Sequence, residues 1–147
     1  MLVLAIGGGV AYTQLVVRGG THDIPWTDVT RKLGPVRWPK QLSVAFHSRR
    51  ALVRWLSENT LPPKPAAPPI DFRHHALLLA AVGPRSSTGY GVEVVRVTER
   101  GGRIDVLLRE RTPRLGERQS ARLTFPYRLL TIHATTKPIH FSYQGRP

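Results

Sequence analysis

The sequence predicts a mainly β fold of the α+β class: an antiparallel sheet, a small β-sandwich or an open barrel, packed against one α-helix. Apolar residues alternate in several stretches between residues 75 and 143, which is the pattern of half-buried strands. One segment, about residues 49–58, carries apolar residues at helical spacing instead. The chain has 147 residues, of which 41% are hydrophobic, so it can bury a core of ordinary size.

The chain opens with an uncharged apolar stretch, Met1–Val17, that is closed by Arg18. As a helix this stretch would span about 25 Å, the lower limit for crossing a bilayer. No basic residue precedes it, unlike the start of a secretory signal peptide. We therefore expect residues 1–18 to be a membrane anchor or signal-like segment. Either the true start lies further upstream, or the segment is an uncleaved anchor. The alternative is a buried helix or strand of a soluble fold.

Residues 19–40 mix glycine, proline, aspartate and threonine without a sustained period, which predicts an irregular lead-in. Two tryptophans, Trp26 and Trp38, fall in this segment. They would sit at a membrane interface, contact a partner or fasten the segment to the domain. Fastening is the favoured interpretation, because a buried tryptophan contributes a large apolar area.

The folded domain is predicted to begin at residue 41. Leu42, Val44 and Phe46 alternate as in an edge strand, and Ser48 is placed to cap the helix that follows. This helix should lie on a sheet and stop near Asn59, and its apolar face is formed by Leu52, Trp55 and Leu56. A proline-rich stretch, residues 61–70, then predicts an extended crossover rather than helix or central strand.

Strands follow in quick succession and fit one antiparallel system. Ala76–Val82 is apolar on both faces, as expected of a central strand covered by a helix or a second sheet. The next strand changes its apolar face near Val94-Val95, which predicts a bulge, and residues 99–102 have the composition of a tight hairpin turn. Pro126 interrupts a later strand and predicts an edge position or a bulge there. Further alternating sets are Ile104, Val106 and Leu108; Leu123, Phe125, Tyr127 and Leu129; and Ile139, Phe141 and Tyr143.

The formal net charge of +13 and the pI near 11.5 predict attraction to anionic partners. Most basic residues are arginines spread singly along the chain, and no run is longer than Arg49-Arg50, which argues against a dedicated nucleic-acid patch. There is no cysteine, so disulfides, thiolate metal sites and cysteine nucleophiles are excluded.

No constellation of catalytic or metal-binding residues emerges from the motifs. His74-His75, His133 and His140 lack metal-ligand spacing, and neighbouring histidines on a strand point to opposite faces. The loop with Ser86, Ser87 and Thr88 contains neither a nucleophile elbow nor the Gly-Lys-Ser/Thr ending of a phosphate-binding loop. The nine acidic residues do not suggest a paired-carboxylate hydrolase. We predict a non-enzymatic protein without cofactor or metal.

A series of motifs resembles the C-terminal domain of the PrcB family over about residues 42–143. The motifs are Ile70-Asp71-Phe72, an apolar strand ending in Gly83, then Ser87-Thr88-Gly89-Tyr90, a hairpin, Thr112-Pro113 and Phe125-Pro126-Tyr127. The resemblance implies an exported or lipid-anchored subunit that associates with and stabilises a cell-surface serine protease, here with residues 41–147 as the PrcB-like domain. This chain departs from the family in reading Thr-Gly-Tyr-Gly where Gly-Gly-Tyr is usual, and in lacking a cysteine for lipid attachment.

Two groups of site residues follow. Binding residues often sit on loops held by a rigid scaffold, so the predicted partner-binding residues are Ser87, Thr88, Gly89 and Tyr90. Asp71 is expected to cap a turn and Phe72 to plug the core. The full set of predicted structural residues is Asp71, Phe72, Gly83, Pro113, Pro126 and Tyr127.

The predicted function is that of a non-enzymatic cell-envelope protein that is tethered by its N-terminus and binds and stabilises a partner protein, which the resemblance implies is a secreted or surface serine protease. The basic residues that follow the apolar segment would instead hold the domain in the cytoplasm under the positive-inside rule, so the orientation stays open. An alternative is a basic surface module for nucleic acid or anionic lipid. A third is a protease inhibitor, because the Thr-Gly-Tyr loop is similar to a loop of chagasin-like inhibitors.

Overall fold

The computed structural model describes residues 20–145, which form eight strands, one 3-10 helix and one α-helix. The predicted mainly β class with one packed helix is confirmed. The predicted anchor, Met1–Val17, lies outside the described residues. Residues 20–145 contain no helix with the length and apolar character needed to span a bilayer. The elements are β1 (His22–Asp23), β2 (Thr27–Asp28), η1 (Thr30–Lys32), β3 (Gln41–Phe46), α1 (Arg49–Asn59), β4 (His75–Val82), β5 (Gly91–Arg100), β6 (Arg103–Arg111), β7 (Tyr127–His133) and β8 (Ile139–Tyr143).

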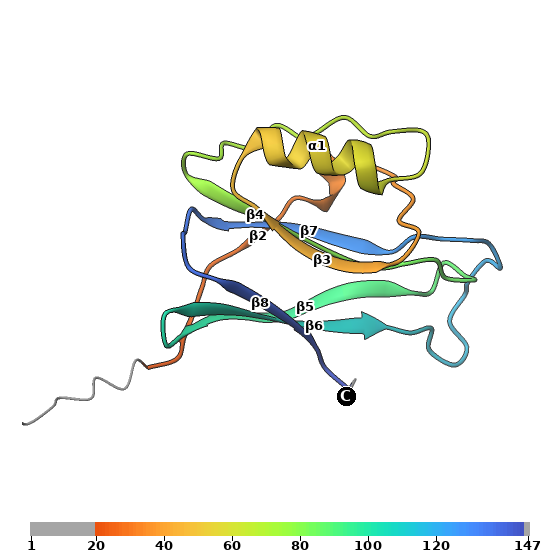
Figure 1. Ribbon diagram of the computed structural model, residues 1–147. Helices are drawn as coiled ribbons and strands as arrows, with labels where there is room; N and C mark the ends of the chain where they lie inside the picture. The colour runs from red at the N-terminus through yellow and green to blue at the C-terminus, as the bar shows by residue number, and fades with distance from the viewer. Residues whose placement is uncertain (1–19, 146–147) are drawn as a thin grey trace, which may run out of the picture.

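The strands form two sheets rather than one. One sheet has the order β1-β5-β6-β8 and the other the order β2-β7-β4-β3. The sheets stack face to face, and α1 covers the outer face of the second sheet (Figure 1). The molecule is therefore a β-sandwich with a helix as a third layer.

Strand β4 separates two apolar cores and contributes to both. Leu77, Leu79 and Ala81 point to the core beneath α1, and Leu78 and Ala80 point to the core between the sheets. Every residue from Ala76 to Val82 is buried. This arrangement confirms the expectation of a central strand, and both proposed coverings are present because a helix and a second sheet occupy opposite faces.

The helix α1 forms as predicted, one residue longer than expected. The Ser48 side chain accepts a hydrogen bond from the Ala51 amide at 3.2 Å, which satisfies one of the free N–H groups of the first turn. Leu52 and Leu56 are buried against the sheet, and the Trp55 ring packs on Phe46 with centroids 5.4 Å apart.

The segment of residues 20–40 adds to both sheets and to the helix-side core. Its strands β1 and β2 pair with β5 and β7. Trp38 is fully buried and lies 5.5 Å from Trp55 and 5.8 Å from Tyr127 between ring centroids, which confirms its fastening role. Trp26, by contrast, is 39% exposed. The predicted division of the chain at residues 18 and 40 stays a prediction.

Two local expectations are confirmed in β5. The pairing with β6 shifts register between Val94 and Arg96, which is the predicted bulge. Gly101 and Gly102 join β5 to β6 with φ angles of 57° and 78°, the left-handed conformation that a two-residue hairpin needs.

Two other expectations are wrong. The prediction that all strands are antiparallel is wrong, because β8 runs parallel to β6. After β7 has joined the other sheet, the chain returns to the first sheet as β8. Pro126 lies neither at an edge nor in a bulge: β7 begins just after it, and its carbonyl accepts a hydrogen bond from Val82. Because Pro126 precedes the strand, no hydrogen bond of the sheet is lost through its missing N–H group.

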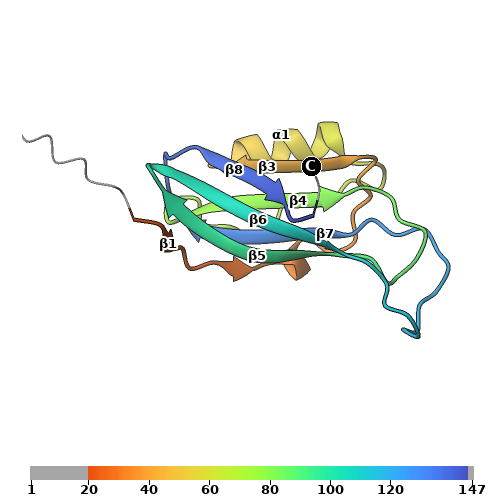
Figure 2. The ribbon, with the colours of Figure 1, turned by 90° about the horizontal axis from the view of Figure 1, so that it is seen from below.

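The connections of the sandwich gather at opposite ends. Residues 83–90 and 112–126 project together at one end, whereas β1 and the turn between β5 and β6 lie at the other (Figures 1 and 2).

Candidate functional site

The candidate site is the end of the sandwich where two loops meet, residues 83–90 and 112–126, which we call the loop end. Gly83 starts the first loop with a φ of 79°. A Cβ atom at this position would lie 3.1 Å from backbone atoms of Lys40 and Gln41. Both conformation and space therefore require glycine where the chain leaves β4.

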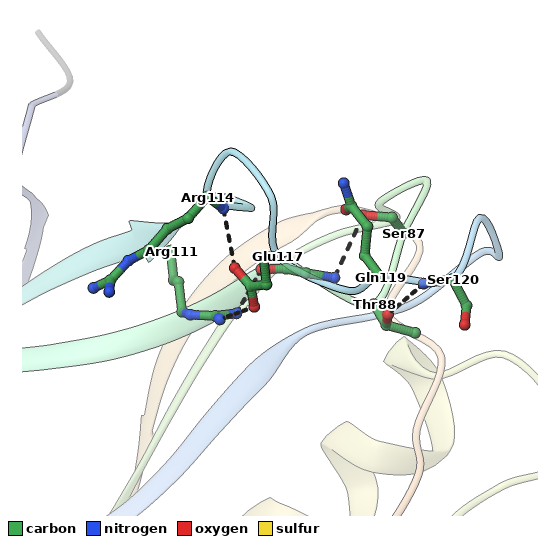
Figure 3. Close-up of polar contacts among 8 residues, drawn as sticks. Ser87, Thr88, Arg111, Arg114, Glu117, Gln119 and Ser120 are labelled. Atoms are coloured by element: carbon green, nitrogen blue, oxygen red, sulfur yellow. Dashed lines mark hydrogen bonds and ion pairs between the residues drawn. The ribbon is translucent and has the colours of Figure 1, made fainter.

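Backbone hydrogen bonds connect the two loops. The amides and carbonyls of Arg85 and Thr124 exchange two bonds of 2.8 Å. Further along, the Thr88 amide donates to the Ser120 carbonyl at 3.1 Å, and the Ser120 amide donates to Thr88 Oγ1 at 2.9 Å (Figure 3). The two long connections thus form one supported surface.

Ser87 and Gly89 lie between the loops. Ser87 is buried, its hydroxyl donates to Gln119 Oε1 at 2.7 Å, and its carbonyl accepts from Thr124 Oγ1 at 2.8 Å. Gly89 is so close to Pro113 that a Cβ atom would lie 2.7 Å from the proline Cγ. These contacts make both residues part of the support beneath the surface.

An arginine and a glutamate stabilise the second loop from within. Glu117 accepts a bond from the Arg114 amide at 3.0 Å and pairs with the Arg111 guanidinium (Figure 3). The hydrogen bond from the Arg114 amide lowers the pKa of Glu117 most, and the hydrogen bond from the Arg111 guanidinium lowers it further. Arg111 also donates to the Gly89 carbonyl at 2.6 Å, so it connects the two loops.

Tyr90 ends the first loop and is half-buried. The Arg85 guanidinium lies over its ring, 6.0 Å from the centroid, and Arg85 Nε donates to Glu110 Oε1 at 2.5 Å. The bond to Glu110 raises the pKa of Arg85, which holds this positive charge beside the tyrosine.

The four residues predicted to bind a partner thus occupy two different environments. Thr88 is exposed and Tyr90 is half-buried, whereas Ser87 and Gly89 are covered by the second loop. The sequence reasoning missed Glu117, Gln119 and Ser120 because nothing in a polar loop indicates which distant loop it will bond to. Of the residues of the second loop that contact Ser87, Thr88 or Gly89, Pro113 was singled out in advance.

Asp71 and Phe72 lie in the turn before β4. Asp71 Oδ1 accepts from the Arg73 amide at 3.1 Å, and its other oxygen contacts His74 Nδ1 at 2.8 Å. The bond from His74, followed by the amide, lowers the pKa of Asp71 to about 2. Phe72 is half-buried and packs against the helix-side core.

Tyr127, just after Pro126, fastens the lead-in to β7. Its hydroxyl donates to the carbonyls of Thr30 and Gly34. Burial raises the pKa of Tyr127 to about 12. Its ring also meets Trp38 edge to face, so polar and apolar contacts act at the same point.

The histidines lie outside the loop end. His75 and His133 face each other across β4 and β7, with their rings stacked at 6.5 Å, and His140 Nδ1 lies 3.6 Å from Asp105. Within residues 20–145 no three histidine, aspartate or glutamate side chains converge as a metal site would require.

Comparison with known proteins gives one match. The PrcB C-terminal family model matches residues 77–133, which agrees with the resemblance in the motifs. The matched span runs from β4 to β7 and includes both loops of the loop end. It suggests a protease-associated protein and a non-catalytic subunit. No curated protein and no solved structure matches the chain.

Proposed function

We propose that this protein is a non-catalytic subunit of the cell envelope that binds and stabilises a protease through its loop end. The observation that carries the proposal is the match to the PrcB C-terminal family, because it covers both loops together with the strands that hold them. Thr88 and Tyr90 are the proposed contact residues. Ser87 and Gly89 support them from below.

The construction of the loop end favours a binding role. Its two loops are joined by backbone and side-chain hydrogen bonds, so the free protein already holds the surface in place. A prearranged surface loses little conformational entropy when a partner binds. The contact residues also lie on loops, outside the regular hydrogen bonding of the sheets, and binding residues are often found on such loops.

The position of the loop end suits a tethered protein. Strand β1 lies at the opposite end of the sandwich from residues 83–90 and 112–126 (Figure 2). A membrane tether formed by the preceding residues would therefore present the loops away from the bilayer. This geometry supports the proposal of an envelope location.

The test is co-purification of the full-length protein from detergent-solubilised native membranes, with identification and stoichiometry of the bound proteins. The test variant is Ser86→Trp, which adds bulk at an exposed position of the first loop. The matched control is Thr136→Trp, which adds the same bulk at an exposed position between β7 and β8, near the other end. Both variants should unfold at the same temperature as the wild type.

We expect a stoichiometric serine protease with the wild type and with Thr136→Trp, and at least about tenfold less with Ser86→Trp, as for a change at the centre of an interface. Equal capture by both variants would show that the loop end is not the contact surface. Recovery of nucleic acid or lipid alone, lost at high salt, would favour the basic surface module instead. A captured protease that is inactive in the complex would favour an inhibitor.

A further inference from the structure

A surface groove of about 700 Å³ opens beside the loop end. One wall comes from residues 35–37 of the lead-in, another from residues 61–63 after α1, and the third from residues 122–127 before and at the start of β7. The groove thus continues the surface of the second loop. Three segments that are distant in the sequence enclose it.

Large apolar side chains are exposed in this groove. Leu61 is 41% exposed and Leu123 is 65% exposed. Leu123 was expected to alternate with Phe125 and Tyr127. All three line the groove, but Phe125 and Tyr127 also pack against the core, whereas Leu123 is exposed. An exposed apolar patch bordered by polar residues is typical of an interaction site, because covering it removes apolar surface from water.

Arg37 and Arg122 give the groove its charge. The side chains that line it include no carboxylate among the described residues. Within residues 20–145, neither Arg37 nor Arg122 forms an ion pair, whereas Arg85, Arg109 and Arg111 each do. An anionic group that enters the groove would therefore meet two positive charges that no carboxylate of the described residues neutralises.

The walls of the groove are held in place. The Leu61 amide donates to the Arg37 carbonyl at 3.1 Å, which joins two of the three walls. Tyr127 donates to the Gly34 carbonyl, and Thr124 is paired with Arg85. The groove therefore exists before binding, so an extended segment can enter without rearranging it.

We infer that this groove receives an extended acidic peptide segment of a partner protein, with an aliphatic side chain between Leu61 and Leu123 and carboxylates at Arg37 and Arg122. The inference rests on the proposed function in that the partner is a protein. A peptide fits better than a nucleic acid, because the exposed leucines match an aliphatic side chain and not a phosphate backbone. The groove is a second contact surface, and no residue of the first loop lines it.

The test uses the full-length protein and short fluorescent peptides in a fluorescence anisotropy titration. The probe carries Asp-Leu-Asp at its centre, and the comparison peptides carry Asp-Ser-Asp or Lys-Leu-Lys. We expect saturable binding of Asp-Leu-Asp, and affinities at least about tenfold lower for both comparison peptides, as when one anchor of an interface is removed. The affinity for Asp-Leu-Asp should fall as salt is raised.

Matched variants locate the binding. Leu123→Asp should lower the affinity at least about tenfold. Leu115→Asp is the control, because Leu115 is also an exposed leucine of the second loop but does not line the groove. The charge-reversed protein Arg37→Glu/Arg122→Glu should prefer Lys-Leu-Lys over Asp-Leu-Asp. Such a reversal cannot come from unfolding of the variant, since an unfolded chain would bind neither peptide selectively.

Equal losses in Leu123→Asp and Leu115→Asp, or no change of preference on charge reversal, would overturn the inference. Displacement of the peptide by phosphatidylglycerol vesicles through Arg122 would reassign the groove to lipid. The two proposals fail separately. A protease that co-purifies with Leu123→Asp as well as with the wild type refutes the groove alone, whereas groove-dependent peptide binding without any captured protease refutes the protease partner alone.

Discussion

Alanine at position 89 should separate the two loops of the loop end. Its Cβ atom would lie 2.7 Å from Pro113 Cγ, 2.8 Å from Pro113 Cβ and 2.9 Å from Gln119 Oε1. The glutamine can turn away, but the proline ring is fixed to its backbone. The ring would have to retreat by about 0.7 Å to reach ordinary contact at 3.4 Å. We expect the second loop to move with it.

The size of the effect follows from two opposing terms. Overpacking of a fixed site costs about 1–3 kcal/mol. Replacing glycine by alanine also lowers the conformational entropy of the unfolded chain, which raises the free energy of unfolding by about 0.4–1 kcal/mol. Gly91→Ala separates these terms, since its Cβ atom would meet only the Arg111 side chain, at 3.7 Å. The difference between the two variants should therefore be about 1–3 kcal/mol, or roughly 3–10 °C in Tm for a domain of this size.

Urea denaturation followed by tryptophan fluorescence measures this difference. A second substitution, Pro113→Gly, removes both proline atoms that meet the new Cβ, so Gly89→Ala should cost much less in its presence. The reasoning is refuted if Gly89→Ala and Gly91→Ala are equally stable. It is also refuted if the effects of Gly89→Ala and Pro113→Gly simply add, because the contact would then not be the cause.

Three further predictions concern the structural residues. Gly83→Ala should lower the free energy of unfolding by about 1 kcal/mol or more relative to Gly101→Ala. Both glycines have positive φ, but only at position 83 would a Cβ atom meet backbone atoms of other residues. Urea denaturation of the two variants measures this difference. The hydrogen bond from His74 is the largest of the effects that lower the pKa of Asp71 to about 2. The Asp71 carboxylate therefore stabilises the folded state above about pH 4, and this contribution is lost as the pH falls toward 2. Asp71→Asn should make acid unfolding less steep, and an unchanged acid profile would contradict this. Tyr127→Phe should cost about 1–2 kcal/mol near neutral pH, because the Gly34 carbonyl loses its donor, whereas the Thr30 carbonyl keeps the Leu33 amide. The pKa of Tyr127, raised to about 12, means that the wild type loses stability as the pH rises from 10 toward 12, so the phenylalanine variant should be less sensitive to alkali, as alkaline denaturation would show.

Local features of the fold could be predicted because their causes lie close together in the sequence. The Ser48 cap, the bulge after Val94 and the glycine hairpin at residues 101–102 each depend on neighbouring residues. The central place of β4 was also predictable, since a strand that is apolar on both faces has to be covered on both.

Features that depend on distant partners could not be predicted. The parallel pairing of β8 with β6 is a matter of topology, and the alternation of Ile139 and Phe141 is the same in either direction. The burial of Trp38 was expected, but the exposure of Trp26 follows from which strands receive the lead-in. At the site, the loop from β4 was identified from its glycines, but its bonds to Ser120 and Gln119 arise from a loop about thirty residues away.

The double burial of β4 has a consequence for how the molecule opens. Because its alternate residues belong to different cores, neither the helix layer nor the second sheet can detach without exposing apolar atoms of the same strand. The amide hydrogens of Leu77 to Ala81 should therefore exchange with solvent only when the whole domain unfolds, and they should be the slowest in the protein. We therefore expect no partly opened form in which one layer is free, so the loop end should be present either complete or not at all.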